Sequence, residues 1–326
     1  MLAAMPRGRI VRLPTRAPDI PLEDVERAEE RIMRHLRHTP QMTTWLDRED
    51  GSRLKIHLKL ENLQITEGFA VRGMLNAALD LSPAQLTRGL VGYGLMHGPA
   101  AAYVAHVLQV PATVFLYPAG ATPDLVRSLE YWGARTRVIG KSLADTETAA
   151  RAHAEQHELT LIRSSASPSF ITGCATIALE MLELEPRLDL LVAAVGFGPL
   201  IAGVACAAKQ IKPGIRVVGV DRVEPRNGYP FASDEPHRFR RLQLGSILDR
   251  AASASLDLVS RFADDVVLVS QAEILDAAHR LWTELEVRTG SFGSSAVAAL
   301  LLGRIPVSED ETVGAVISTA GGDGLF

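Results

Sequence analysis

Short apolar runs alternate along this chain with longer segments in which apolar residues recur at helical spacing. The short runs have the length of a buried strand, roughly four to eight residues. The pattern predicts strands at 54–60, 90–93, 110–116, 136–139, 159–162, 188–195, 216–220, 266–269 and 313–318. It predicts helices at 21–37, 72–81, 100–108, 124–132, 144–158, 168–180, 271–286 and 294–302, and one that ends at Gln210. Residues 222–265 are expected to be rich in loops. Alternating strands and helices are typical of parallel sheets covered by helices on both faces.

Local signals mark where some of these helices begin and end. Ser82 precedes Pro83, so we expect Ser82 to cap a short helix with proline in its first turn. Gly133 follows the helix predicted at 124–132, as expected for a residue that leaves a helix in a left-handed conformation. Pro40 disfavours helix at Thr39 and closes the first helical segment.

Composition limits the class of the protein. The chain has 326 residues, 47% hydrophobic but only 5% aromatic, which predicts an aliphatic core in one compact unit or in two lobes around a cleft. A net charge of −4 argues against nucleic acid as a partner. Cys174 and Cys206 lie among small apolar residues and are expected to be packing thiols in a reducing, cytoplasmic setting.

Nothing in the chain predicts a membrane segment. Apolar runs fall short of the roughly 20 residues that span a bilayer. Residues 1–16 lack the apolar core of a signal peptide. We therefore expect residues 1–20 to form a loosely ordered N-terminal arm and the protein to make no membrane contact.

One stretch carries most of the information about function. Residues 59–73 read K-L-E-N-L-Q-I-T-E-G-F-A-V-R-G. The stretch resembles the lysine segment of the fold-type II pyridoxal-phosphate-dependent enzymes, the branch of serine/threonine dehydratase and serine racemase, where it reads K-x-E-N-L-Q-x-T-G-S-F-K-x-R-G. H-T-P at 38–40, I-A-L-E at 177–180 and D-D-V-V-L-V-S at 264–270 extend the resemblance from about residue 21 to the end of the chain.

The resemblance implies a tryptophan synthase beta-like fold, which is α/β with two lobes, each a mainly parallel sheet flanked by helices. We expect a larger lobe from residues 21–52 and 151–326 and a smaller lobe from residues 53–150. Because relatives are commonly dimers and symmetric pairing is the commonest soluble assembly, we expect a homodimer or a partner of an active paralogue.

The lysine that would hold pyridoxal phosphate in such a family is replaced by Ala70. Alanine has no nucleophile, so covalent attachment of the cofactor is not expected at this position. The five lysines of the chain are predicted on the preceding strand or on surface helices and loops: Lys55, Lys59, Lys141, Lys209 and Lys212.

Two further cofactor contacts implied by the resemblance are altered. Met96 stands at the asparagine that would donate a hydrogen bond to the cofactor ring, which methionine cannot do. The glycine-rich phosphate loop has become Gly196-Phe197-Gly198-Pro199. Pro199 removes one N–H donor and Phe197 adds bulk where the phosphate would approach, so we expect the turn to persist with less capacity for anions.

A third contact keeps polar residues. Ser318 and Thr319 stand where the family has hydroxyls near the ring nitrogen, although the same residues suit a strand that runs into a turn. Asp221 follows a strand at the position of an acidic metal ligand in some relatives, but its companions are absent, so no metal is expected.

Three other residues are candidates for chemistry in the altered cleft. Glu67 replaces a glycine of the family motif and either points into the cleft, where it would repel a phosphate, or faces solvent from a turn. His97 is either a packing residue or a catalytic group, and Tyr93 precedes it on the same loop.

These substitutions leave three hypotheses. The first is a threonine/serine dehydratase-like pseudoenzyme that has lost its cofactor lysine and has a binding, regulatory or partner-subunit role, with a small-molecule ligand in the old cleft. The second is an enzyme that uses the cleft for chemistry without pyridoxal phosphate, with His97, Tyr93, Glu67 and Thr319 as candidates. The third is a pyridoxal-phosphate-dependent ammonia-lyase or dehydratase with an unrecognised lysine.

Overall fold

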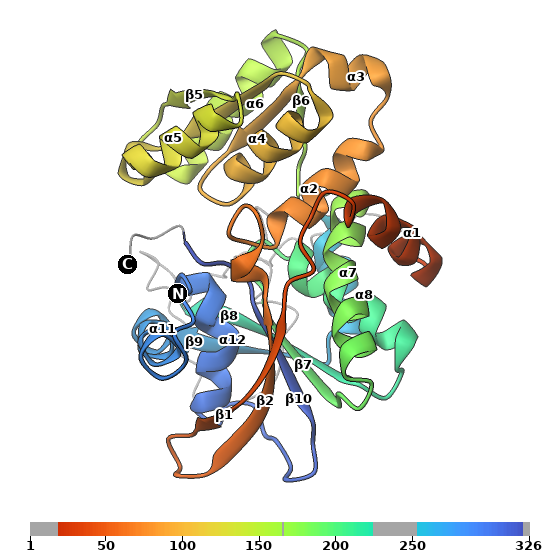
Figure 1. Cartoon of the computed structure of the whole chain (residues 1–326), viewed down its shortest axis with the longest axis vertical. Helices are drawn as coiled ribbons and strands as arrows, with labels where there is room; N and C mark the ends of the chain where they lie inside the picture. Colours follow the sequence, from red (N-terminus) through yellow and green to blue (C-terminus); the bar gives the residue numbers. More distant parts are fainter. Residues whose placement is uncertain (1–18, 165, 224–252, 322–326) are drawn as a thin grey trace, which may run out of the picture.

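The computed structural model describes residues 19–164, 166–223 and 253–321. It contains two sheets, one of six strands and one of four. Figure 1 shows the two sheets in separate parts of the molecule, with helix α2 (Ala70–Leu79) close to their junction. The α/β class and the two mainly parallel sheets expected from the sequence are confirmed.

The larger sheet has the strand order β1-β2-β10-β7-β8-β9. Neighbouring strands run parallel except β1 and β2, which pair antiparallel at one edge. The strands of this sheet are β1 (Gln41–Asp47), β2 (Arg53–Leu60), β7 (Leu190–Ala194), β8 (Arg216–Val223), β9 (Asp265–Ser270) and β10 (Val313–Ile317). The short connection between β1 and β2 permits only an antiparallel pair, because a parallel pair needs a long crossover.

Helices cover both faces of this sheet. Leu191 and Ala193 of β7 pack in one core and Leu190 and Val192 in the other, because successive side chains of a strand point to opposite faces. The first core includes helices α1 (Leu22–Ile32), α7 (Pro168–Leu184), α8 (Pro199–Ile211) and α10 (Ser253–Phe262). The second includes α11 (Gln271–Leu285) and α12 (Ser291–Leu301).

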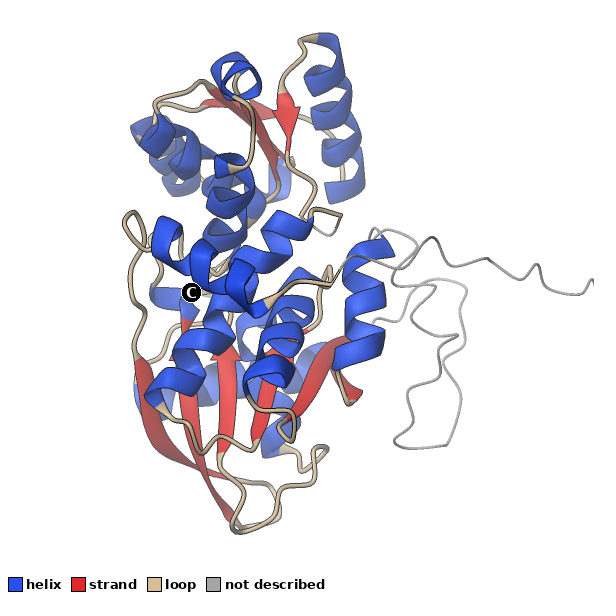
Figure 2. Cartoon of the chain, turned by 90° about the vertical axis from the view of Figure 1, so that its right-hand side faces the viewer, coloured by secondary structure: helices blue, strands red, loops and turns tan. Residues whose placement is uncertain are grey.

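The smaller sheet has the order β5-β4-β3-β6, and all its neighbours are parallel. Its strands are β3 (Leu90–Tyr93), β4 (Ala112–Leu116), β5 (Arg135–Val138) and β6 (Thr160–Leu161). The helices of this part are α3 (Pro83–Arg88), α4 (His97–Leu108), α5 (Pro123–Tyr131) and α6 (Leu143–Gln156). Figure 2 shows this sheet above the larger one, with helices packed against each.

The course of the chain through the larger sheet creates a switch point between β7 and β10. From β7 the chain steps outward to β8 and β9 through α8 and α10 on one face. It then returns through α11 and α12 on the other face and enters β10 on the opposite side of β7. In sheets of this kind, ligands bind outside the carboxyl ends of the strands at such a switch point.

The predicted caps are confirmed. The Ser82 hydroxyl accepts a hydrogen bond from the backbone N–H of Gln85, and the Gln85 side-chain oxygen accepts one from the backbone N–H of Ser82, with Pro83 in the first turn of α3. Gly133 has a φ of +78° after the end of α5. Cys174 and Cys206 are buried free thiols, and burial raises the pKa of both, as expected for packing residues.

One expectation about secondary structure was wrong, and another is tested only in part. The helix expected at 21–37 ends at Ile32, because Gln64 holds both the backbone N–H and the carbonyl of Arg37 outside helical geometry. The stretch 222–265 contains helix α10 within its described part. Residues 224–252 of that stretch, and residues 1–18 of the expected N-terminal arm, lie outside the described residues.

The sheets divide the chain at different residues from the expected lobe boundaries. Strand β2, within the range expected for the smaller lobe, pairs with β1 and β10 in the larger sheet. Strand β6 begins after residue 150 and pairs with β3 in the smaller sheet. Where the two lobes separate as folding units stays a prediction. None of the described helices is both long enough and apolar enough to cross a bilayer.

Candidate functional site

Four ionised side chains form a buried cluster beside α2. Arg72 donates two hydrogen bonds of 2.8 Å to the carboxylate of Glu61 and binds Glu180 at 2.5 Å. Lys59 binds Glu180 at 2.5 Å and the backbone oxygen of Thr39 at 2.7 Å. We call these four side chains, Lys59, Glu61, Arg72 and Glu180, the ion cluster. Its two cations and two carboxylates balance each other away from water.

Each charge of the ion cluster depends on its neighbours. Burial alone would lower the pKa of Arg72, but the carboxylates of Glu61 and Glu180 outweigh burial and raise it. Burial alone would raise the pKa of Glu180, but Arg72 and Lys59 outweigh it and lower it. The cluster joins the 59–73 motif to helix α7, so these motif residues have a structural role that needs no cofactor.

Two amides of the same motif hold distant backbone segments. Gln64 accepts a hydrogen bond of 3.0 Å from the Arg37 N–H and donates one of 2.8 Å to its carbonyl. Asn62, in the short helix η1 (Glu61–Leu63), donates a hydrogen bond of 2.8 Å to the carbonyl of Arg288. Together with the ion cluster, these amides hold the segment that follows β2 against helix α7, Arg37 and Arg288.

Ala70 lies at the first position of α2 and is 1% exposed. Gly73 follows one turn later on the same face of the helix. A Cβ placed on Gly73 would lie 2.4 Å from the ring of Phe170, so α2 and this ring are in direct contact. The ring of Phe170 lies 5.8 Å from that of His97. The lysine position therefore faces the junction of the two sheets and carries only a methyl group.

The structure describes all five lysines of the chain, and none lies on α2. Lys59 belongs to the ion cluster, and Lys55 is exposed near the start of β2. Lys209 binds the carbonyl of Ile215 and Asp264, and Lys212 binds the carbonyl of Leu188 and Asp189. Lys141 is exposed at the start of the segment that leads into α6.

Glu67 occupies a strained turn against the end of β10. Its φ is +56°, a left-handed backbone conformation that residues other than glycine rarely adopt. Its carbonyl accepts hydrogen bonds of 2.9 Å from the Thr319 hydroxyl and from the Ala320 N–H. Its side chain is exposed, and a Cβ placed on Gly321 would lie 3.4 Å from its carboxylate. The backbone at Glu67 thus adopts a conformation that glycine, the residue of the family motif at this position, takes without strain.

The hydroxyls of Ser318 and Thr319 are engaged within the protein. Ser318 donates to the carbonyl of Phe292 at 3.3 Å, and Thr319 donates to Glu67 as described. The carbonyl of Thr319 also accepts a hydrogen bond of 3.0 Å from Thr289. The structure places both residues at the carboxyl end of β10, where they close the turn that holds Glu67.

The glycine-containing turn Gly196–Pro199 opens helix α8. Gly196 and Gly198 have φ values of +51° and +98°, which explains why both glycines are needed for the turn. The N–H of Gly198 is bound to the carbonyl of Val195 at 2.8 Å, and Pro199 has none. The turn therefore offers an anion neither the N–H of Gly198, which is already bonded, nor an N–H at Pro199. A Cβ placed on Gly196 would meet no atom within 4 Å.

His97 connects the two parts of the molecule. It lies at the start of α4, and its ring is 6.2 Å from that of Phe197 at the start of α8. Burial lowers the pKa of His97 to about 4, so its imidazole is neutral at pH 7. Its Nε2 atom is buried and has no hydrogen-bond partner among the described residues.

Tyr93 and Met96 flank this histidine. The ring of Tyr93 lies 6.3 Å from that of His97. Burial, with a contribution from Glu147, raises the pKa of Tyr93 to about 12, so its hydroxyl stays protonated. Met96 precedes α4 without capping it and packs against the larger apolar core. The structure thus brings Tyr93, His97 and Phe197 together, and it brings Thr319 and Glu67 together at the end of β10.

Sequence reasoning missed Phe170, which links α2 to His97. The residue follows the helix-opening step Ser167-Pro168 and stands in the first turn of α7. An aromatic residue in that turn, in a chain with few aromatics, was the available signal.

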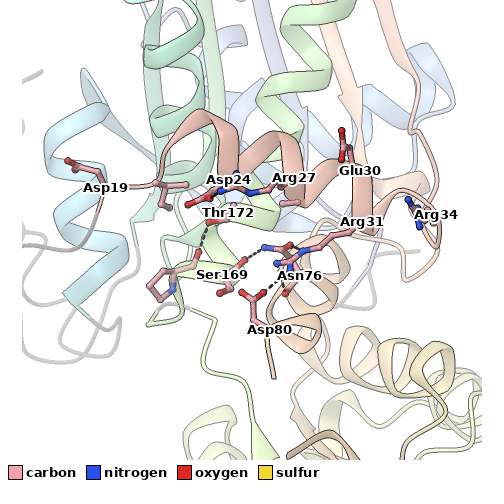
Figure 3. A pocket seen from close by; sticks show the side chains of 13 residues that line it. Asp19, Asp24, Arg27, Glu30, Arg31, Arg34, Asn76, Asp80, Ser169 and Thr172 are labelled. Carbon is pink, nitrogen blue, oxygen red and sulfur yellow. Dashed lines mark hydrogen bonds and ion pairs between the residues drawn. The ribbon is translucent and has the colours of Figure 1, made fainter. Parts of the chain in front are cut away.

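A separate polar cavity of about 620 Å³ lies away from this site, between α1, the end of α2 and the start of α7. Figure 3 shows Arg31 directed at Asn76 and Asp80 across it. Arg27 forms an ion pair with Asp24, and Arg31 forms one with Asp80.

Among the described residues, no three His, Cys, Asp or Glu side chains gather as metal ligands. Asp221 is buried at β8.

Comparison with known proteins identifies the fold and the family. Residues 32–319 match the family described as pyridoxal-phosphate-dependent enzymes. An L-threo-3-hydroxyaspartate ammonia-lyase of Pseudomonas is 29% identical over 293 residues, which cover 85% of this chain and 88% of that protein. An L-threonine dehydratase of Staphylococcus aureus is 27% identical over 310 residues, which cover 93% of this chain and 89% of that protein.

A solved structure gives the same result. The serine racemase of Dictyostelium discoideum superposes with a TM-score of 0.75 at 25% identity, over 92% of this chain and 98% of that one. The chain therefore belongs to the fold-type II pyridoxal-phosphate-dependent enzyme family, as a threonine/serine dehydratase-like member.

Proposed function

We propose that this protein is a pseudoenzyme of the dehydratase family, which forms no Schiff base with pyridoxal phosphate and has a binding, regulatory or partner-subunit role. The observation that carries the proposal is the buried methyl group of Ala70 at the lysine position. Covalent catalysis needs a nucleophile within bonding reach of its target, and a methyl group supplies none.

The positions and contacts of the five lysines support the proposal. Lys59 is the lysine nearest to Ala70 along the chain, and its ammonium group is bound by Glu180 and Thr39. Turning Lys59 into the cleft would leave Glu180 with one cation fewer in a buried site, at a cost of roughly 3–5 kcal/mol. The other four lysines lie near the start of β2, before α6, or at the end of α8.

The phosphate turn gives further support, because the residues present do not fit the cofactor. The Gly198 N–H is already bonded, Pro199 has no N–H, and Phe197 projects a ring that is 41% exposed. Pyridoxal phosphate would meet fewer donors here than a helix start with a run of glycines offers.

One observation favours the alternative of an enzyme that works without pyridoxal phosphate. His97 is a buried, neutral imidazole with an unpartnered Nε2 at the junction of the two sheets, and a neutral imidazole can accept a proton. Tyr93 and Glu67 would supply further polar groups. The third hypothesis, a lyase with an unrecognised lysine, would require one of the bound or distant lysines to move into the cleft.

The experiment is to incubate the purified protein with pyridoxal phosphate, reduce with borohydride and map any modified lysine by peptide mass spectrometry. A dehydratase of the family that has the motif lysine is the positive control, and A70K tests whether the cleft accepts the cofactor once an amine is present. We expect no specific adduct on the wild-type chain at a stoichiometry approaching one. A single stoichiometric adduct, abolished by changing one lysine, would instead establish the lyase hypothesis.

We also propose that the protein forms a homodimer or pairs with an active paralogue, and that it works in the cytoplasm. The two-fold pairing common among soluble oligomers supports the first proposal. Light scattering on the purified chain distinguishes a dimer from a monomer, and a monomer that gains mass with a co-expressed paralogue would favour the partner-subunit role.

A further inference from the structure

Two histidines lie in contact at the end of helix α6, beside the smaller sheet. His153 is in the last turn of α6, and the N–H of His157 donates a hydrogen bond of 3.1 Å to the carbonyl of His153. The helical turn therefore reaches His157, and residues four apart on a helix lie on the same face. The centroids of the two imidazole rings are 4.4 Å apart.

One of these rings is held in place, and the other can adjust. The ring of His153 packs against that of Phe115 in β4, with centroids 5.3 Å apart. The side chain of His157 is exposed, so its ring can turn between staggered rotamers. The two imidazoles are tilted by 56° to each other, so they are not stacked face to face. The pair combines one anchored ring with one adjustable ring.

The imidazole nitrogens of the pair are available as ligands. The structure gives neither ring a hydrogen bond to another described residue. Burial, Arg137 and His157 lower the pKa of His153, so its ring is neutral at pH 7.5. A neutral imidazole has one nitrogen with a lone pair, and it is the commonest metal ligand among side chains. Zinc, copper and nickel ions all suit this ligand.

The separation of the rings selects the geometry of the ion. A metal–nitrogen distance of about 2.0–2.1 Å places the ion about 3.2 Å from the centre of each ligating ring. Centroids 4.4 Å apart then subtend an angle of about 90° at the ion. This is the angle between adjacent ligands of a square-planar or octahedral ion. A tetrahedral ion such as Zn²⁺ requires about 109°, which corresponds to centroids about 5.2 Å apart.

The charges around the pair do not oppose a cation on balance. The carboxyl end of a helix carries roughly half a unit of negative charge, and the pair lies at that end of α6. Glu155 is exposed in the same turn, and Glu158 follows it, paired with Arg88 at 3.5 Å. Arg137 of β5 acts on His153 with the opposite sign. The helix end and Glu155 therefore offset Arg137.

We propose that His153 and His157 bind one divalent transition-metal ion of square-planar or octahedral preference, Ni²⁺ or Cu²⁺, with water completing its coordination. Water is needed because the described residues contain no group of three metal-binding side chains. The site goes beyond the proposed function and does not rest on it, since it lies on α6, apart from Ala70 on α2. A bound ion joins successive turns and so stabilises the end of α6.

The experiment titrates the full-length protein, freed of any affinity tag and of metal, with NiCl₂ at pH 7.5 and follows binding by isothermal titration. We expect one tight equivalent of Ni²⁺, and ZnCl₂ bound at least threefold more weakly. H157Q changes an exposed side chain and should weaken Ni²⁺ at least tenfold. With one equivalent of CuCl₂, electron paramagnetic resonance should show hyperfine coupling to two imidazole nitrogens in wild type and to one in H157Q.

Three variants serve as controls. A152H combined with H157Q keeps nine histidines but makes two of them adjacent, where side chains on a helix do not face each other, so Ni²⁺ should bind as weakly as to H157Q alone. R137Q removes the opposing charge and should tighten Ni²⁺ about twofold or more. H279Q removes an exposed histidine on α11 and should leave the tight equivalent unchanged.

The outcomes decide the site without reference to the cofactor. Equal Ni²⁺ affinity in wild type and H157Q overturns the proposal, as does tight binding restored by A152H in the H157Q background. Coupling of Cu²⁺ to a single nitrogen in wild type, Zn²⁺ bound as tightly as Ni²⁺, or no binding below millimolar concentration also overturns it. The proposed function is decided separately by the lysine adduct with pyridoxal phosphate.

Discussion

The ion cluster and the cleft edge, by which we mean Glu67, Ala70 and His97, differ in whether their polar groups have partners. Within residues 59–73, three members of the ion cluster flank Glu67 and Ala70 on both sides. In the ion cluster every charged group has partners at hydrogen-bond distance. At the cleft edge, Ala70 offers no polar group, His97 Nε2 has no partner among the described residues, and Glu67 strains the backbone. The residues shared with the family's lysine motif thus include those that hold the fold.

The difference explains how the structural residues of the motif can persist after its cofactor contacts have been replaced. Removing one member of a buried ion cluster leaves an uncompensated charge, so substitution there is costly. Replacing a cofactor contact at the cleft removes an interaction with a ligand and leaves the packing of the protein intact. A sequence match through E-N-L-Q and V-R-G therefore reports the fold, and only the site residues report the activity.

The largest expected effect breaks the ion cluster. Among the described residues, R72M leaves Glu180 paired with Lys59 and Glu61 without a cation, and we expect it to lower the free energy of unfolding by roughly 3–5 kcal/mol. Denaturant unfolding followed by circular dichroism measures the change. R88M is the control, because the Arg88–Glu158 pair is exposed and should contribute less than about 1 kcal/mol. A loss for R72M as small as for R88M would show that the cluster does not hold the fold.

The next effect concerns His97 at the cleft edge. Its pKa is about 4 in the folded protein and 6.5 in the reference state, so the folded state resists protonation. Stability from this group is complete above pH 6.5 and is lost as the pH falls toward 4, by about 2 kcal/mol at pH 5. H97F should abolish this loss, and should stabilise the protein by about 1 kcal/mol at pH 7.5 because no polar atom is left unpaired. Unfolding at both pH values checks this, and an unchanged pH dependence would mean that Nε2 is satisfied in solution.

A smaller effect, with the opposite dependence of stability on pH, is expected at Glu29, whose carboxyl group interacts with members of the ion cluster. Burial, together with Glu183 and Glu180, raises the pKa of Glu29 from 4.5 to about 7. The folded state therefore binds this proton more tightly than the unfolded state, and stability is lost as the pH rises from 4.5 to about 7. We expect E29Q to be more stable than wild type at pH 8, by about 1 kcal/mol after allowing for solvent screening of a half-buried group. The two proteins should be equally stable at pH 4.5, and a difference that persists there would point to packing instead of charge.

The smallest expected effect relieves the turn at Glu67. E67G should raise the free energy of unfolding by about 0.5–1 kcal/mol, because glycine adopts a φ of +56° without strain. E286G provides the comparison, since Glu286 has the same φ and should gain as much. Only E67G should also increase the affinity for inorganic phosphate, measured by isothermal titration. A loss of stability in E67G alone would show that the Glu67 side chain makes a stabilising contact.

Much of the fold could be predicted because local patterns and tertiary structure agree. Strands β3 and β7 are continuous apolar runs, and Ser82 caps α3 with Pro83 in its first turn, as expected. The first helix ended early because a distant side chain, Gln64, binds Arg37. A contact between residues far apart in sequence leaves no local pattern, so helical spacing alone could not place that end.

The candidate site was only partly predictable for the same reason. The sequence by itself determined the α/β class, the family and the absence of a lysine at position 70, because each depends on residue identity or spacing. Only the tertiary structure decided that the motif residues close a buried ion cluster, that Phe170 joins α2 to His97, and that Glu67 meets the end of β10. These relations bring together residues that are dozens to hundreds of positions apart, and their distances are set by the packing of helices and strands.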